Sequence, residues 1–126
     1  MSCILIVDDQ PVIRRLLAVT LGKDYVVLEA QDGEGALEAV RQHHPGIVLL
    51  DIMMPGALDG LQVLDALKRD PLTRDILVAI VSARGQTSDR EDALRRGADA
   101  YFIKPFSPQQ VLAWVHNKLP PVSSSP

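Results

Sequence analysis

Four short apolar runs in this chain each end on a polar residue that can take part in chemistry. They are Ile4–Val7 before Asp8 and Asp9, Ile47–Leu50 before Asp51, Leu77–Val81 before Ser82, and Ala100–Ile103 before Lys104. Runs this apolar are typical of parallel strands that are buried on both faces. The carboxyl ends of such strands form the ligand crevice of an open α/β sheet, so these polar residues are expected to converge at one edge.

Segments with helical patterns separate these runs, and a further strand is expected at residues 25–30. The expected helices span residues 11–21, 34–42, 61–69, 88–96 and 108–119. Alternation of strand and helix predicts an α/β fold with a doubly wound, five-stranded parallel sheet flanked by five helices. The expected strand order is 2-1-3-4-5.

Three helices carry more specific expectations. In the first helix, Ile13, Leu16, Leu17 and Thr20 are expected to form the inner face. The helix at 88–96 has only Ala93 and Leu94 as clear apolar positions, so it is expected to be short or loosely held. Ser107, Pro108 and Gln110 form a capping-box pattern at the start of the last helix.

Length and charge limit what the chain can be. Its 126 residues fit one domain at 1–119, followed by a Pro/Ser-rich tail or linker stub at 120–126. The net charge of −3 argues against direct binding of nucleic acid. No basic leader and no apolar run approaching ~18 residues is visible, so a cytoplasmic protein without a membrane segment is expected.

The converging residues suggest a metal site beside a reactive carboxylate. Neighbouring carboxylates repel each other unless a cation lies among them. Asp9 and Asp51 offer the hard oxygen ligands that Mg²⁺ prefers, and Mn²⁺ would fit as well. Asp51 is the expected nucleophile, because carboxylates can form aspartyl phosphates. Lys104 and Ser82 could each hold one phosphoryl oxygen.

Each of these residues also has an ordinary structural interpretation. Taken alone, Asp51 would be a turn or cap carboxylate, Asp8 and Asp9 the N-cap of the first helix, Ser82 a turn residue and Lys104 a solvated lysine. The expectation that all of them meet at one sheet edge favours the chemical interpretation. Asp9 could serve as both cap and metal ligand.

The same residues carry a family resemblance. The chain resembles the receiver domains of two-component response regulators, which have the flavodoxin-like fold of CheY. The matching residues are Asp8-Asp9, Asp51 with Met54-Pro55, Ser82-Ala83, Gly97-Ala98-Asp99 and Tyr101-Phe102-Ile103-Lys104-Pro105-Phe106. The resemblance runs from about Cys3 to Leu119, and the motifs in this order are highly specific.

The resemblance implies a phosphorylation-dependent signalling domain. A histidine kinase or phosphotransfer protein would supply the phosphoryl group to Asp51 in a Mg²⁺-dependent reaction. The backbone carbonyl of Met53 would complete the metal ligands, and Asp8 would act behind them or through a water. The chain would catalyse only its own phosphorylation and dephosphorylation. A downstream effector protein, or an output domain C-terminal to this chain, would read the result.

The resemblance also implies a switch and local details. Ser82 and Tyr101 would couple the phosphoryl group to a partner-binding surface, with Tyr101 rotating inward on phosphorylation. Met53 and Arg84 would flank the phosphoryl group. The peptide bond between Lys104 and Pro105 would be cis.

Two features depart from the family pattern. Three residues separate Pro55 from Asp59, where the family usually has two, so the path of this loop stays open. Ala100 and Trp114 occupy positions where winged-helix transcription factors of the family usually carry an acidic residue and an arginine. The dimer of that subclass is therefore not expected.

Three other functions compete with a phosphorylated receiver. A hydrolase of the haloacid-dehalogenase type also uses a strand-end aspartate, but it usually needs a second acid where this chain has Met53. A flavodoxin-like cofactor binder would place phosphate beside Asp8 and Asp9, which would repel it. A degenerate receiver that only binds other proteins remains the main alternative.

Overall fold

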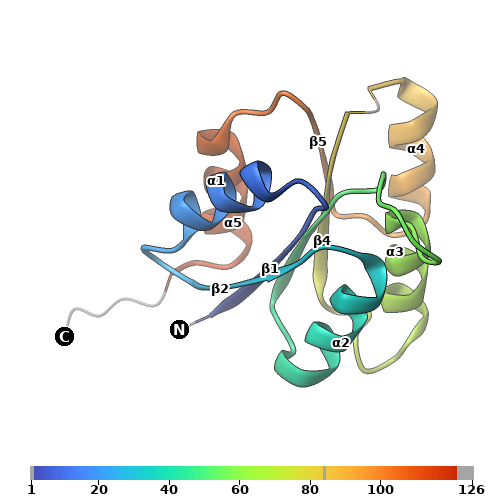
Figure 1. Cartoon of the computed structure of the whole chain (residues 1–126), viewed down its shortest axis with the longest axis horizontal. Coiled ribbons are helices and arrows are strands. Elements are labelled where there is room, and N and C mark those ends of the chain that lie inside the picture. Colours follow the sequence, from blue (N-terminus) through green and yellow to red (C-terminus); the bar gives the residue numbers. More distant parts are fainter. Residues whose placement is uncertain (1, 84, 122–126) are drawn as a thin grey trace.

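The computed structural model describes residues 2–83 and 85–121, and they form a three-layered α/β fold (Figure 1). Five parallel strands pair in the order β2-β1-β3-β4-β5, which confirms the predicted fold class and strand order. Their bounds are Cys3–Val7 for β1, Val26–Ala30 for β2, Ile47–Leu50 for β3, Leu77–Ser82 for β4 and Ala100–Ile103 for β5. Arg84 and most of the predicted tail, residues 122–126, lie outside the described residues.

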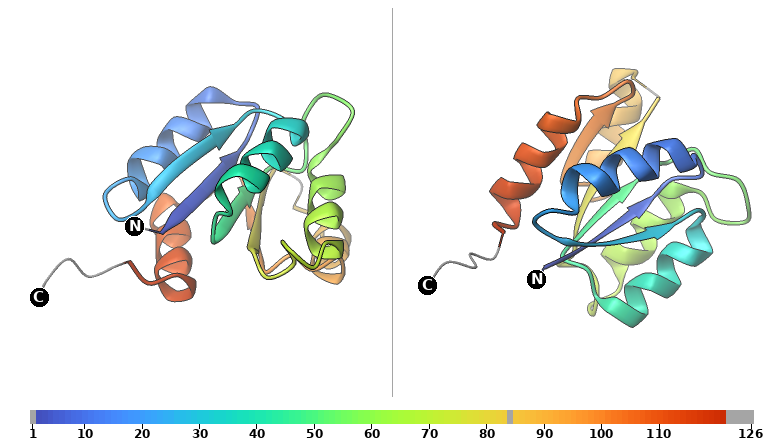
Figure 2. Two further views of the ribbon diagram at one scale, coloured as in Figure 1. Left: turned by 90° about the horizontal axis from the view of Figure 1, so that it is seen from below. Right: turned by 60° about the vertical axis from the view of Figure 1, so that its left-hand side comes forward.

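Helices cover both faces of the sheet. The described residues form α1 (Pro11–Leu21), α2 (Gly33–His43), α3 (Gly60–Arg69), α4 (Thr87–Arg95) and α5 (Pro108–Lys118). Helices α1 and α5 lie on one face, and α2, α3 and α4 lie on the other (Figure 2). The loops that follow the carboxyl ends of the strands therefore lie between the two layers of helices (Figure 1).

Alternation of side chains along the strands divides the core in two. In β1, Leu5 and Val7 pack towards α2 and α3, whereas Ile4 and Ile6 pack towards α1 and α5. This follows from the two-residue period of a strand. The three central strands are almost entirely buried, as predicted, but β2 is an edge strand and its side chains are largely exposed or half-buried. Tyr25 precedes β2 and is not part of it.

The strand register aligns the polar ends. Val7 of β1 pairs with Leu50 of β3, and Leu50 pairs with Ile80 of β4. Residues Asp8 and Asp51 follow directly after a paired position. Both carboxylates therefore lie at the same end of the sheet, where the strands finish.

The predicted inner face of α1 was wrong at Leu16, which is 41% exposed. Leu17 is buried as predicted, and Leu21, one turn further along, is buried with it. Neighbouring residues of a helix point about 100° apart, so Leu16 falls outside an inner face that is centred on Leu17 and Leu21. In α4, where Ala93 and Leu94 were the clear apolar positions, Ala93 is buried and Leu94 is among the exposed large apolar side chains.

The loop between β3 and α3 absorbs its extra residue before the helix begins. Gly56 has a φ of 103°, which favours glycine. Asp59 then caps α3: its carboxylate accepts the Gln62 N–H at 2.9 Å, and the Gln62 side chain accepts the Asp59 N–H at 2.9 Å. Gly60, the first residue of α3, packs against the backbone of Asp51 and Ile52. A Cβ at this position would overlap the carbonyl oxygen of Asp51. Asp51 precedes this loop and lies with Asp8 and Asp9 as expected.

At the other end of the chain, the Ser107 side chain accepts the Gln110 N–H at 3.3 Å, which is the Ser107 half of the predicted capping box. The peptide bond between Lys104 and Pro105 is cis, as the resemblance implied.

Candidate functional site

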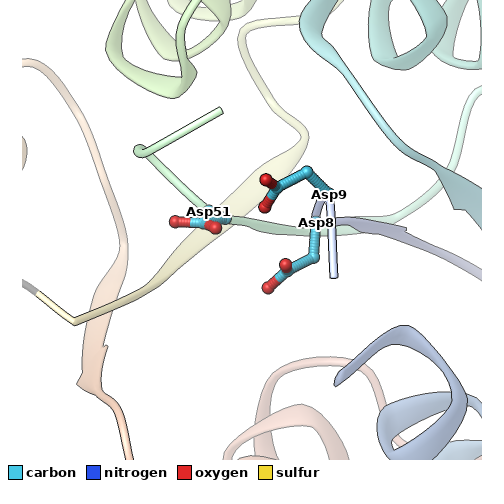
Figure 3. A group of neighbouring side chains, drawn as sticks. All are labelled: Asp8, Asp9 and Asp51. Carbon is cyan, nitrogen blue, oxygen red and sulfur yellow. The ribbon is translucent and has the colours of Figure 1, made fainter. Parts of the chain in front are cut away.

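Three carboxylates gather where β1 and β3 end (Figure 3). Asp8 is 2% exposed and Asp51 is 4% exposed, whereas Asp9 is open to solvent. Each of the three offers one oxygen, and these oxygens all lie within 4.8 Å of one another. The predicted convergence of Asp8, Asp9 and Asp51 is thus what the structure shows.

Backbone hydrogen bonds carry the sheet one residue past the strand ends. The N–H of Asp8 donates to the carbonyl of Ala30 at 3.1 Å, and the N–H of Asp51 donates to that of Val7 at 2.9 Å. The N–H of Lys104 donates to the carbonyl of Ser82 at 2.8 Å. The backbone of Asp8, of Asp51 and of Lys104 is therefore fixed by a hydrogen bond to the neighbouring strand.

Lys104 reaches back across the strand ends to the carboxylates. Its Nζ lies 2.8 Å from Asp8 Oδ2 and 3.3 Å from Asp51 Oδ2. A third acceptor, Gln10 Oε1, lies 3.2 Å away. A lysine ammonium has three N–H donors, so these three acceptors match its full capacity.

Burial and charge oppose each other at Asp51. Burial is the largest influence and raises the pKa of its carboxyl, and the charge of Asp8 adds to the rise. The Met53 N–H, which donates to Asp51 Oδ1 at 2.9 Å, and the Lys104 ammonium both act to lower it. The pKa of Asp51 ends above its ordinary value, so the cost of burying the charge is only partly offset.

The opposite balance holds for Lys104. Burial favours a lower pKa for its ammonium, but hydrogen bonds and charges from Asp8 and Asp51 outweigh burial. The pKa of Lys104 therefore ends above its ordinary value, and the side chain is a fixed positive charge in the site.

The donor set fits a divalent cation. Three ionised carboxylates and one ammonium leave a formal local charge of about −2. Hard oxygen ligands of this kind suit Mg²⁺, and Mn²⁺ fits for the same reason. Asp9, exposed beside the buried pair, can offer its carboxylate to an ion entering from solvent.

A cleft of about 270 Å³ opens above these residues. Its lining residues are Asp9, Gln10, Asp51, Met53, Ala83 and Lys104. Met53 is exposed at its mouth. The cleft gives a small anionic group access to Asp51 from solvent.

Ser82 and Tyr101 are both buried. Ser82 is fully buried at the end of β4, and Tyr101 of β5 pairs in register with Ile80 of β4. Strand alternation puts Ser82 on the same sheet face as Ile80 and Tyr101, towards the α3 and α4 side. Tyr101 is 9% exposed and already lies inward, although the sequence led us to expect inward rotation only on phosphorylation.

Sequence reasoning missed two residues and misplaced one role. Asp9 does not cap α1: Gln10 holds the N-cap position without a side-chain cap bond, and its N–H donates to Asp8 Oδ1 at 2.9 Å. Arg14 donates to the carbonyl of Asp8 at 2.7 Å and pairs with Glu29 at 3.2 Å. Gln10 could have been noticed because it directly follows Asp8 and Asp9 in the sequence. Arg14 could have been noticed because it is a basic residue in the first turns of the helix that follows them.

Comparison with known proteins agrees with this geometry. The family described as the response regulator receiver domain matches residues 4–116. The chain belongs to this family. Over 111 residues it is 40% identical to the phosphate regulon transcriptional regulatory protein PhoB of Escherichia coli, a match that covers 87% of this chain and 48% of PhoB. The chain thus spans about half the length of the curated relatives it matches.

Solved structures show the same receiver fold. A putative response regulator from Chloroflexus aurantiacus is 32% identical, with a TM-score of 0.86, and the match covers 94% of this chain and 97% of that one. The BeF3-activated receiver domain of DrrB is 26% identical, also with a TM-score of 0.86, covering 94% of this chain and 97% of that one. Membership of a response-regulator family is consistent with two-component signalling.

The receiver family generally uses a metal ion, and the acidic cluster of this chain could bind one. Within residues 2–83 and 85–121, no helix is long and apolar enough to cross a membrane.

The raised pKa of Asp51 predicts how stability changes with pH. The folded chain binds the Asp51 proton more tightly than the unfolded chain, so protonation of Asp51 favours folding. Asp51→Asn removes the buried charge and cannot titrate. In metal-free buffer we expect this variant to melt above the wild type at pH 7, and the difference to shrink as the pH falls towards about 4.

Thermal unfolding followed by circular dichroism from pH 4 to pH 8 measures this difference. Asp75→Asn, at an exposed position, serves as the control for loss of one negative charge. If Asp51→Asn instead melts below the wild type at pH 7, the ionised Asp51 carboxylate stabilises the fold and the electrostatic argument is wrong.

Proposed function

We propose that this receiver domain accepts a phosphoryl group on Asp51 in a Mg²⁺-dependent reaction and thereby changes a partner-binding surface. The observation that supports it most is the meeting of Asp51 with Lys104 and two further carboxylates at an open cleft. A histidine kinase or a histidine phosphotransfer protein would be the donor.

The chemistry is transfer of a phosphoryl group from nitrogen to oxygen. An Asp51 carboxylate oxygen attacks the phosphorus of a phosphohistidine, and an O–P bond forms as the P–N bond breaks. The electron pair of that bond goes to the imidazole nitrogen, which takes a proton from solvent. Such transfers depend mainly on positioning and on neutralising charge.

The residues around Asp51 would supply these two effects. The Met53 N–H holds Asp51 Oδ1, so the carboxylate has a set orientation before the donor arrives. Lys104, already close to Asp51 Oδ2, can pair with a phosphoryl oxygen, and the Ser82 hydroxyl can donate to another. When bound by Asp9, Asp51 and the Met53 carbonyl, Mg²⁺ would neutralise charge on the phosphoryl oxygens, with Asp8 behind these ligands.

The chain would turn over no separate substrate. Its activity would be limited to its own phosphorylation and to hydrolysis of the aspartyl phosphate by water. Met53 is exposed and lines the cleft, so its side chain would influence how water and donor reach Asp51. In this sense the chain would be a switch and not an enzyme.

The switch would act through Ser82 and Tyr101. A phosphoryl group on Asp51 would offer a new acceptor to the Ser82 hydroxyl. Ser82 pairs with Ile103 of β5, and Tyr101 lies two residues before Ile103 on the same face of the sheet. In this structure Tyr101 is already inward, so phosphorylation would favour that position over an outward one and would not create it. The affected surface is formed by α4, β5 and α5.

Helix α4 is the element best suited to move. Its buried residue within the described helix is Ala93, and Leu94 stays exposed, so α4 has little apolar surface to hold it. Elements with few buried contacts open at low cost in free energy. The partner that binds this surface would be a separate effector protein or an output domain C-terminal to this chain.

A receiver that only binds partners is the alternative function. It would need neither a metal nor a phosphoryl group, and the packing of α4, β5 and α5 alone is compatible with it. The presence of Asp8, Asp9, Asp51, Ser82 and Lys104 together favours phosphorylation.

Phosphorylation of the intact chain is the first test. Incubation with acetyl phosphate and Mg²⁺ should add about 80 Da, the mass of one phosphoryl group, at Asp51. The modification should be lost with a chelator and in Asp51→Asn. Intact-mass spectrometry with borohydride trapping of the aspartyl phosphate locates the site. An unmodified wild type under these conditions would support the binding-only alternative.

The switch has a separate test. Backbone amide spectra of the chain with Mg²⁺, recorded with and without the phosphoryl mimic beryllofluoride, should differ at residues 82–96 and 101–106 as well as at the acidic cluster. Shifts confined to residues near Asp8, Asp9 and Asp51 would mean that the site takes the mimic without signalling through α4, β5 and α5.

A further inference from the structure

Gln10 contacts the lysine of the site, although neither sequence reasoning nor the proposed function gives it a role. Its Oε1 accepts from Lys104 Nζ at 3.2 Å, and its side chain lines the cleft above Asp51. We propose that Gln10 is a positioning residue for phosphoryl transfer, which acts by orienting the Lys104 ammonium; this inference rests on the proposed function.

Gln10 is itself held in place by the acidic pair. Its backbone N–H donates to Asp8 Oδ1 at 2.9 Å, while Asp8 Oδ2 accepts from Lys104 at 2.8 Å. The bond from Lys104 to Gln10 Oε1 closes a ring of three hydrogen bonds. Both anchors of the ammonium, Asp8 and Gln10, therefore belong to the short segment that joins β1 to α1.

Two anchored N–H groups fix the direction of the third. With Asp8 and Gln10 as acceptors, the remaining N–H of Lys104 points to Asp51 Oδ2, 3.3 Å away. Once Asp51 carries a phosphoryl group, its oxygen in the P–O bond loses its charge and becomes a poorer acceptor. The same N–H then has a phosphoryl oxygen as its natural partner, without any change at Asp8 or Gln10.

Loss of the Gln10 oxygen would leave only one anchor. A lysine ammonium sits on a flexible four-carbon stem, so with Asp8 alone it can rotate and swing across the cleft. Gln10 is neutral, so it orients the ammonium without competing for it as a third carboxylate would. Phosphoryl transfer should become slower, because Lys104 is less often in place when the donor arrives.

The test compares variants of similar length and hydrophobicity. Gln10→Met keeps the reach of the side chain but removes the amide oxygen. The matched control is Gln42→Met on α2, another exposed glutamine, whose amide bonds to Glu38 at 2.8 Å far from the cleft. We expect Gln10→Met to slow labelling of Asp51 by acetyl phosphate and Mg²⁺ about threefold to tenfold, the range expected for one lost hydrogen bond. Gln42→Met should match the wild type.

A double-mutant cycle shows whether Gln10 acts through Lys104. In a Lys104→Met background, where labelling is followed over a longer time, adding Gln10→Met should cause no further slowing. A second readout needs no phosphorylation: in metal-free buffer, the ¹H–¹⁵N signal of the Lys104 ammonium should be observable in the wild type and exchange-broadened in Gln10→Met.

Each outcome decides the inference. Equal labelling rates of Gln10→Met and wild type, or equal slowing by Gln10→Met with and without Lys104, would overturn it while leaving the proposed function intact. An unchanged Lys104 ammonium signal in Gln10→Met would overturn it as well. If the wild type itself takes no phosphoryl group, the proposed function fails first, and the inference falls with it.

Discussion

The contact between Lys104 and the two buried carboxylates is the interaction on which the site depends. Asp8 and Asp51 are both almost fully buried, at the ends of neighbouring strands, and two such charges repel each other. Lys104 comes from the end of β5, two strands beyond Asp51, and offsets part of that repulsion. Because the offset is partial, the site keeps a demand for positive charge. This demand is the reason why the acidic cluster could bind a divalent cation, as the proposed function requires.

Much of this arrangement could be predicted from the sequence, because it follows from strand ends. Short continuous apolar runs, typical of strands buried on both faces, placed Asp8, Asp51, Ser82 and Lys104 together at the carboxyl ends of the strands. Parallel pairing then places those ends together whatever the helices do in detail. The prediction succeeded for these residues since it needed only the strand order and the direction of the chain.

Other features depend on packing that the sequence pattern does not specify. Leu16 and Leu17 are equally apolar, and only the contact of α1 with the sheet decides that Leu17 is inside. The run from Val26 to Ala30 is apolar except for Glu29, yet its place as an edge strand leaves even its apolar residues exposed or half-buried. Gln10 could not be assigned a role because it lies beyond the end of β1, where the direction of its side chain depends on the turn into α1 and not on the strand pattern. The inward position of Tyr101 likewise reflects the tertiary core.

Beryllofluoride binding is the most direct test of the central claim. The claim is that Asp51, in a site with an excess of negative charge, takes a phosphoryl group together with a divalent cation. ¹⁹F NMR of the chain with beryllofluoride reports bound fluorines separately from free ones. The account predicts protein-bound resonances in the presence of Mg²⁺, their disappearance on chelation of the metal, and their absence in Asp51→Asn. Bound resonances that persist without a divalent cation, or that remain in Asp51→Asn, would contradict it.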